Sequence, residues 1–197
     1  MGRPTCYRCF RPRVACICDL VRPIANRTRV LILQHPRERK HPFGTARIAR
    51  LGLSNVDVVL AEADDGEIRA PAQTLERAAL LYPGRDAATL GEDPVELDTL
   101  VVVDGTWPQS RKLVRVSPWL GALPRVALQP PRPANYRIRR AKRPAFEVST
   151  IEAIAYALRH LEPDTPGIDG LVETFDEVID HQLGLQGDGD APRFKSI

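Results

Sequence analysis

The sequence lacks the long apolar segments that would place it in or across a membrane. No apolar run among its 197 residues approaches the roughly 18 residues that a membrane-spanning helix needs. The opening MGRPTCYRCF also lacks the apolar core of a secretory signal. We therefore expect neither an integral membrane protein nor a secreted one, but a cytoplasmic protein in which thiols stay reduced.

Several common catalytic motifs are missing as well. The sequence contains no G-x-G-x-x-G, P-loop, H-E-x-x-H or G-x-S-x-G motif. Their absence argues against a dinucleotide enzyme, an NTPase, a zinc protease and an α/β-hydrolase. What is present is an ordinary globular composition, with 43% hydrophobic and 27% charged residues. Length and composition together predict one domain with a small appendage.

Positive charge is concentrated in two blocks. Residues 1–50 carry 12 Lys or Arg residues against two acidic ones, and residues 132–143 carry six against none. The segments between and after these blocks are acidic. Basic clusters with an interleaved tyrosine, here Tyr136, are typical of proteins that bind a phosphate backbone. A solubilising face or a patch for anionic lipid is the alternative.

The four cysteines fall within one short N-terminal segment. Cys6, Cys9, Cys16 and Cys18 follow the pattern C-x2-C-x6-C-x-C. Short spacings of this kind favour a tetrahedral zinc site. Four thiolates leave no open coordination position, so such a zinc would be structural. A [4Fe–4S] cluster also takes four cysteines and stays open as the alternative.

Three arginines, Arg8, Arg11 and Arg13, lie between the cysteines. Their charge would offset that of the thiolates and favour the deprotonated form. The same arginine-bearing knuckle is a candidate surface for RNA. We expect it to form a separate unit over residues 1–22, followed by the main domain over residues 23–185 and a flexible tail over residues 186–197.

The rest of the chain alternates predicted strands with predicted helices. Apolar and β-branched runs predict strands at residues 29–34, 56–60, 100–103 and 125–128. A further apolar run, at residues 75–81, is ambiguous. Cap and stop signals, among them a capping box at residues 149–152, predict helices at residues 46–51, 108–116, 150–161 and 169–183. This alternation predicts an α/β fold, and the unbroken run at 100–103 predicts a parallel sheet covered on both faces.

Three loops that follow predicted strands are candidate site loops. In an open α/β sheet, ligands bind at the carboxyl ends of the strands. The loops begin at His35, at Tyr82 and at Asp104. We expect them to converge on one pocket.

The loop DGTW at residues 104–107 has the strongest chemical signal. It offers a carboxylate, a glycine that permits close approach, and an indole on which a base can stack. A capped helix start with a packed Trp107 explains the same residues equally well.

Longer motifs then match a known family. DGTWPQSRKLVRVSPWL from residue 104, LPRV from residue 123, YRIRR from residue 136 and STIEAIAYAL from residue 149 resemble the DTW-domain proteins. The cysteine pattern, which ends in CICD, resembles the knuckle of that family. The shared features extend from Cys6 to about Leu161. Gly44 departs from the asparagine expected before Thr45, so no side-chain role is assigned to position 44.

The resemblance implies a fold, a reaction and a donor. The fold is SPOUT-like, with a mostly parallel sheet flanked by helices and a C-terminal knot around the cofactor. The activity is that of a tRNA-uridine aminocarboxypropyltransferase. S-adenosylmethionine would donate its 3-amino-3-carboxypropyl group to N3 of a tRNA uridine and leave as 5′-methylthioadenosine.

The resemblance also suggests roles for particular residues. Asp104 is the candidate general base, and Thr106 and Trp107 accompany it in the catalytic loop. Two loops are assigned to donor binding: Leu81, Tyr82, Pro83, Gly84, Ser149, Thr150 and Glu152. Contacts with tRNA are expected from a larger, mostly basic set: Arg8, Arg11, Arg13, His35, Arg111, Lys112, Arg137, Arg139, Arg140, Lys142 and Arg143.

Two other functions stay open at this point. A SPOUT-like RNA methyltransferase would use the same donor but release S-adenosylhomocysteine. A zinc-knuckle RNA-binding module without catalysis would not need a carboxylate at the end of a buried strand. Neither the oligomeric state nor the target uridine follows from the sequence.

Overall fold

The six strands within the described residues form one parallel sheet. We analysed a computed structural model that describes residues 4–39, 41, 44–62, 75–133, 135 and 147–187. The strand order is β2-β1-β5-β3-β6-β4, and every paired neighbour runs parallel. The strands are β1 (Arg29–Gln34), β2 (Val56–Leu60), β3 (Ala78–Leu81), β4 (Ala88–Thr89), β5 (Thr99–Asp104) and β6 (Arg125–Ala127). The predicted parallel α/β architecture is confirmed.

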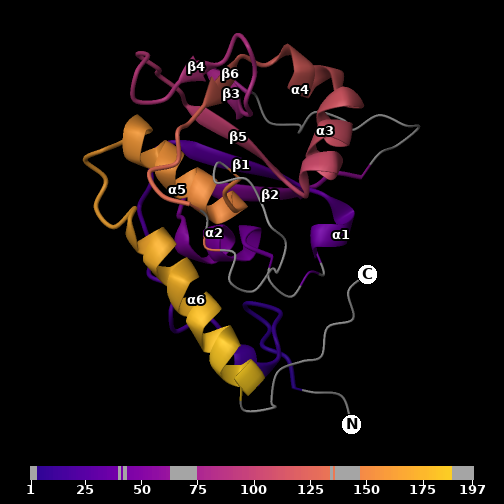
Figure 1. The fold of residues 1–197 in the computed structure, drawn as a ribbon, viewed down its shortest axis with the longest axis vertical. Coiled ribbons are helices and arrows are strands. Elements are labelled where there is room, and N and C mark those ends of the chain that lie inside the picture. The colour runs from indigo at the N-terminus through magenta and orange to yellow at the C-terminus, as the bar shows by residue number, and fades with distance from the viewer. Residues whose placement is uncertain are drawn as a thin grey trace.

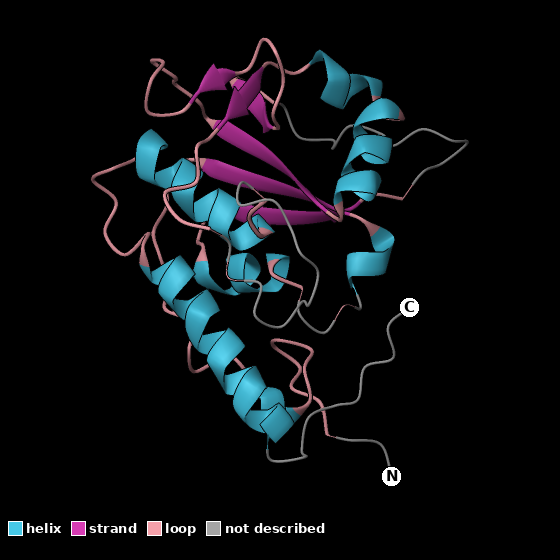
Figure 2. Ribbon diagram, viewed as in Figure 1, coloured by secondary structure: helices cyan, strands magenta, loops and turns pink. Residues whose placement is uncertain are grey.

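Helices cover both faces of the sheet. Figures 1 and 2 show α2, α5 and α6 on one face, and α3 and α4 on the other. The helical elements are η1 (Arg13–Ala15), α1 (Pro36–Arg39), α2 (Ala46–Gly52), α3 (Trp107–Arg115), α4 (Pro118–Ala122), α5 (Thr150–Leu161) and α6 (Gly170–Gly187). Within the described ranges, no helix combines the length and apolarity that crossing a bilayer requires.

The central strands are apolar at successive positions because each face meets its own core. Val30 and Ile32 of β1 belong to the cluster that includes residues of α2, α5 and α6. The alternate residues, Leu31 and Leu33, belong to a second cluster with Leu113 of α3 and Leu120 of α4. This two-sided burial is the reason that β1 and β5 appear in the sequence as continuous apolar runs.

Most predicted elements lie where the sequence put them, and the exceptions have local causes. The ambiguous run at 75–81 contains β3, whose first three residues are buried. Thr45, the expected cap of α2, has helical backbone angles and makes no capping hydrogen bond through its side chain. Three short elements, α1, β4 and α4, were not predicted, because they span too few residues to show a period.

Some expectations fall on residues that the structure does not describe. The C-terminal knot stays a prediction, because residues 134 and 136–146 between β6 and α5 lie outside the described ranges. The predicted tail begins at residue 186, but α6 continues through Gly187. The remaining tail residues, 188–197, also lie outside the described ranges.

Candidate functional site

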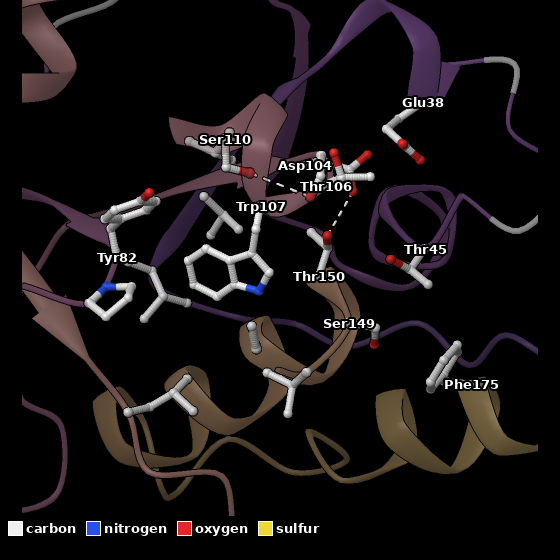
Figure 3. A pocket seen from close by; sticks show the side chains of 18 of the residues that line it. Glu38, Thr45, Tyr82, Asp104, Thr106, Trp107, Ser110, Ser149, Thr150 and Phe175 are labelled. Atoms are coloured by element: carbon white, nitrogen blue, oxygen red, sulfur yellow. Dashed lines mark hydrogen bonds between the residues drawn. The ribbon is translucent and has the colours of Figure 1, made fainter. Parts of the chain in front are cut away.

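A cavity of about 330 Å³ lies at the carboxyl ends of β3 and β5. Figure 3 shows side chains from several parts of the chain that face this space. They come from the segment after β1, from the ends of β3 and β6, from the loop between β5 and α3, from the start of α5 and from the side of α6. This position agrees with the general rule for ligand sites in parallel sheets.

Asp104, the last residue of β5, is fixed in the wall of this cavity. Its side chain is only 4% exposed. Gln34 Nε2 donates to Oδ2 at 2.8 Å, and Thr150 Oγ1 donates to Oδ1 at 2.7 Å. Each carboxylate oxygen has two acceptor sites, so each keeps capacity for one more partner. The carboxylate therefore has a defined orientation and can still accept a proton or a hydrogen bond from a ligand.

Thr106, rather than Asp104, begins helix α3. Thr106 is the N-cap residue, and its backbone N–H donates to Gln109 Oε1 at 2.6 Å. The capped helix start that the sequence also allowed is therefore present, with Thr106 as the cap, while both side-chain oxygens of Asp104 are engaged elsewhere. A Cβ at Gly105 would lie 3.2 Å from Gln109 Cβ, so glycine is what lets the loop close over the helix start.

Trp107 and Tyr82 form an aromatic wall of the cavity. Their rings meet edge to face, with centroids 5.9 Å apart and planes at 61°. The Arg125 guanidinium lies over the Tyr82 ring at 5.6 Å. Burial raises the pKa of the Tyr82 phenol, although Arg111 and Arg125 oppose the shift, so the hydroxyl stays protonated near neutral pH. Gly84 is outside the cavity lining, and a Cβ there would lie 3.0 Å from Arg125 Nη1.

The start of α5 completes the site on the other side. Ser149 and Thr150 line the cavity, whereas Glu152 does not and is fully buried behind them. Glu152 Oε2 accepts hydrogen bonds from the backbone N–H and the hydroxyl of Ser149, and its Oε1 accepts from the Asn135 N–H at 3.1 Å. Glu152 thus closes the predicted capping box and holds Asn135 at the cavity edge.

His35 contacts the 104–107 loop through the Asp104 carbonyl and does not line the cavity. Its backbone N–H donates to the Asp104 carbonyl at 2.9 Å, and its Nδ1 accepts from the Arg37 N–H at 3.2 Å. Burial, reinforced by the charges of Arg37 and Lys112, lowers the pKa of His35, and Asp104 opposes this only in part. The imidazole is therefore neutral at pH 7.

The predicted RNA-contacting residues are distributed unevenly. Arg111 and Lys112 are exposed on α3, close enough to Tyr82 and His35 to affect their titration. Arg8 and Arg13 are exposed on the knuckle. The remaining predicted residues, Arg137, Arg139, Arg140, Lys142 and Arg143, lie outside the described ranges.

Arg11 differs from its neighbours because it is buried. It is 4% exposed, and its Nη2 donates to Gln182 Oε1 of α6 at 2.6 Å. Burial and the nearby Arg47 lower the pKa of its guanidinium to about 10. Arg11 thus ties the knuckle to α6, and it is left out of the RNA-contacting set proposed below.

The four cysteines converge on one point, as their spacing predicted. Their sulfur atoms all lie within 4.8 Å of one another. Cys6 Sγ lies 3.8 Å from Cys18 Sγ, and Cys9 Sγ lies 3.7 Å from Cys16 Sγ. Backbone N–H groups of Cys9 and Arg8 lower the pKa of the Cys6 thiol to about 6, whereas burial raises the pKa of the Cys16 and Cys18 thiols. The cluster can therefore hold a metal ion through four sulfur ligands.

Sequence reasoning missed several cavity residues. Gln34 was only the last position of a predicted strand, and its bond to Asp104 depends on β1 lying beside β5 in register. Glu38 and Thr45 reach the cavity from the segment that follows β1. Arg47 of α2 is close enough to both Asp104 and Cys9 to feel their charges. Glu38 could have been identified only from its position, as an acidic residue shortly after the end of a predicted strand.

Comparisons with known proteins show the family to which the chain belongs. The DTW domain family matches residues 3–183. A protein of Drosophila melanogaster called tRNA-uridine aminocarboxypropyltransferase 2 is 34% identical over 195 residues, which cover 92% of this chain and 76% of that protein. The Mus musculus protein of the same name is 30% identical, and the match covers 64% of its length. The Arabidopsis thaliana tRNA-uridine aminocarboxypropyltransferase A is 26% identical. No solved structure gives a significant match.

Proposed function

The chain belongs to the DTW domain family, and from that premise we propose that it is a tRNA-uridine aminocarboxypropyltransferase. It would transfer the 3-amino-3-carboxypropyl group of S-adenosylmethionine to N3 of a tRNA uridine. The names of its relatives support the reaction. The observation that carries the proposal to this chain is the Asp104 carboxylate, held by Gln34 and Thr150 in the wall of a ligand-sized cavity.

The chemistry of the cavity suits a cationic donor. Asp104 and Glu38 contribute carboxylates to its lining, and none of the lining residues that the structure describes is Lys or Arg. S-adenosylmethionine carries a positive sulfonium and a positive ammonium group, which two carboxylates attract. A nucleoside triphosphate would lack the basic partners that phosphates need. The Trp107–Tyr82 wall offers a surface on which the adenine can pack.

In the proposed reaction, uracil N3 attacks the γ-carbon of the methionine chain. The new N3–C bond forms as the C–S bond breaks, and the electron pair of that bond leaves with the sulfur of methylthioadenosine. The proton of N3 must go to a base, and Asp104 is the carboxylate fixed in the cavity with free acceptor capacity. The sulfonium is already a good leaving group, so positioning supplies much of the rate.

Gln34 and Thr150 would act as positioning residues. Both donate to Asp104, so they hold the carboxylate in one orientation while it receives the proton. Glu152 works one layer further out by fixing Ser149 and Asn135 at the cavity edge. Three elements of the fold, β1, β5 and α5, thus set the geometry at one carboxylate.

We propose zinc for the cysteine cluster and a SPOUT-like assignment for the fold. A tetrahedral zinc with Zn–S bonds of about 2.3 Å places its sulfurs roughly 3.8 Å apart. The two measured separations, 3.8 and 3.7 Å, support that ion. Zinc would supply structural cross-linking only. The parallel sheet with a cavity at its carboxyl edge supports the fold assignment.

Mass spectrometry of a reaction with purified protein, unmodified tRNA and S-adenosylmethionine tests the proposed function. We expect a mass gain on tRNA that matches an aminocarboxypropyl group, together with released methylthioadenosine. A methyl gain with S-adenosylhomocysteine would instead assign the chain to RNA methylation. No gain, with tRNA bound and no thermal shift from the donor, would leave a non-catalytic RNA-binding module.

A further inference from the structure

Two aromatic side chains on the cysteine knuckle are strongly exposed. Tyr7 is 87% exposed and Phe10 is 63% exposed. Both belong to the segment that holds the four cysteines, and neither takes part in the hydrophobic clusters of the main domain. Together with Arg8, Arg13 and Arg50 they form what we call the knuckle face.

The backbone conformation of Phe10 gives a second reason to infer a role for its exposed ring. Phe10 has a φ of 56°, in the left-handed region that favours glycine. Its N–H donates to the Cys6 carbonyl at 2.8 Å, so the turn around the cysteines fixes this conformation. Glycine would adopt the turn at lower cost. A phenylalanine that is strained and also solvent-exposed points to a role in binding rather than in folding.

The charges around the two rings are positive. The Arg50 guanidinium lies over the Phe10 ring at 5.5 Å, and its Nη2 donates to the Arg8 carbonyl. Arg8 and Arg13 are exposed, and residues 4–18 include no Asp or Glu. Unpaired nucleotides are bound by this combination, because bases stack on aromatic rings while arginines contact the phosphates.

The knuckle is attached beside the cavity. Arg11 fixes it to Gln182 of α6. Arg11 also lines a small gap together with Thr45 and Phe175, two residues that line the main cavity as well. Figure 1 shows the N-terminal segment lying against the lower part of α6, below the ends of the strands. The knuckle as a unit therefore lies near the candidate active site.

We propose that the knuckle face is a stacking platform for unpaired nucleotides of the substrate RNA. Tyr7 and Phe10 would hold nucleotides outside the target position, while the target uridine enters the cavity. The inference rests on the proposed function in taking RNA as the substrate. It goes beyond that function by naming a second contact site and its mode of recognition.

Fluorescence anisotropy with two labelled RNAs tests the platform. The probes are a short single-stranded RNA and a fully paired duplex of the same length, each added to the full chain. We expect Phe10→Gly and Tyr7→Ala each to weaken single-strand binding on the order of 10-fold. Duplex binding should change little, because paired bases are not available for stacking. Equal losses with both probes, or no loss with either, would overturn the proposal.

The salt dependence of RNA binding distinguishes a contribution from ring stacking from a contribution made by charge. Removing one cation that neutralises a phosphate should flatten the slope of log affinity against log salt by a little less than one unit. The aromatic variants should therefore keep the wild-type slope, whereas Arg8→Ala should flatten it. A slope that flattens in Phe10→Gly would show that the ring only positions an arginine.

Thermal melting tests whether a loss of RNA binding has a purely structural cause. Since glycine relieves the strained φ, Phe10→Gly should melt at or above the wild-type temperature while binding RNA more weakly. A lower melting temperature with normal RNA binding would contradict the proposal. Val14→Ala is the matched control, because Val14 is an exposed apolar residue of the same knuckle, 53% exposed, without a ring. It should bind both probes as the wild type does.

The two proposals can fail separately. Aminocarboxypropyl transfer is read from the mass of the tRNA, whereas the platform is read from binding without a donor. If the wild-type protein shows no transfer but Phe10→Gly still weakens single-strand binding, the platform proposal stands and the transferase proposal fails. If the wild-type protein is active but the aromatic variants bind both probes normally, only the transferase proposal stands.

Discussion

Thr150 Oγ1 donates a hydrogen bond to Asp104 Oδ1 at 2.7 Å, across 46 positions of sequence. The bond joins the first residue of α5 to the last residue of β5. Figure 3 shows it at the edge of the cavity. Together with Gln34 on the neighbouring strand, Thr150 fixes the carboxylate that we propose as the base.

Replacing Asp104 with Asn should abolish transfer while leaving the protein folded and still able to bind the donor, although more weakly because one of the two cavity carboxylates is lost. Asparagine is isosteric, and the Thr150 hydroxyl can turn to accept from its amide. It cannot take up the N3 proton, so we expect the rate to fall roughly 100-fold or more. Single-turnover product formation measures the loss, and a thermal shift with S-adenosylmethionine checks donor binding. Wild-type turnover by this variant would remove Asp104 from the role of base.

Removing the Thr150 hydroxyl should disturb the same carboxylate indirectly. Thr150→Val leaves Asp104 Oδ1 without its buried donor, which should lower the free energy of unfolding by about 1–2 kcal/mol. Transfer should slow, because the carboxylate is no longer held in one orientation. Chemical denaturation and initial rates measure the two effects. Thr150→Ser restores the hydroxyl and should recover both, and failure of that rescue would point to packing of the methyl group instead.

Zinc should be present in one equivalent per chain and should stabilise the fold. Metal analysis of the purified protein identifies the ion, since an iron–sulfur cluster would contain iron and absorb visible light. Cys16→Ser should lower the zinc content and the melting temperature. Because Arg11 of the knuckle donates a hydrogen bond to Gln182 of α6, loss of the metal should also destabilise α6. Undiminished stability after complete chelation would show that the cysteines do not hold a structural metal.

Stability should decrease below about pH 6.5 because of His35. Its pKa is lowered in the folded protein, mainly by burial, so the unfolded chain binds the proton more readily. The contribution of His35 is therefore complete above its unfolded pKa and is lost as the pH falls through the folded one. Urea denaturation measures the free energy of unfolding at about pH 8 and about pH 5.5. The difference between these two free energies should be smaller for His35→Gln than for the wild type. Identical differences would contradict this assignment.

The exposed cations of α3 should contribute to RNA affinity through charge. Arg111→Ala with Lys112→Ala should weaken tRNA binding and flatten its salt slope by about two units if each residue contacts one phosphate. Arg27→Ala is the matched control, because the exposed Arg27 precedes β1 at the opposite end of the sheet. If the control variant alters the slope equally, the RNA is attracted by the overall positive charge of the protein and not by these two residues of α3.

The elements with a strong local pattern could be predicted from sequence. The apolar runs of β1 and β5 follow from burial on both faces, and the capping box of α5 follows from Ser149 and Glu152. The cysteine spacing predicted the sulfur cluster. The rule on strand ends placed Asp104 and Tyr82 at one edge of the sheet. Each of these inferences depends on neighbours in sequence or on the period of one element.

Partners distant in sequence were decided by the tertiary structure alone. Gln34 meets Asp104 because β1 pairs with β5 in a particular register, which no local pattern encodes. Arg8, Arg11 and Arg13 look equivalent in sequence, yet packing against α6 buries Arg11 and leaves the other two exposed. The order of residues sets which chemical groups the protein has and in which local elements they lie. The sheet order and helix packing decided which groups meet, because contacts between distant segments depend on how the whole core closes.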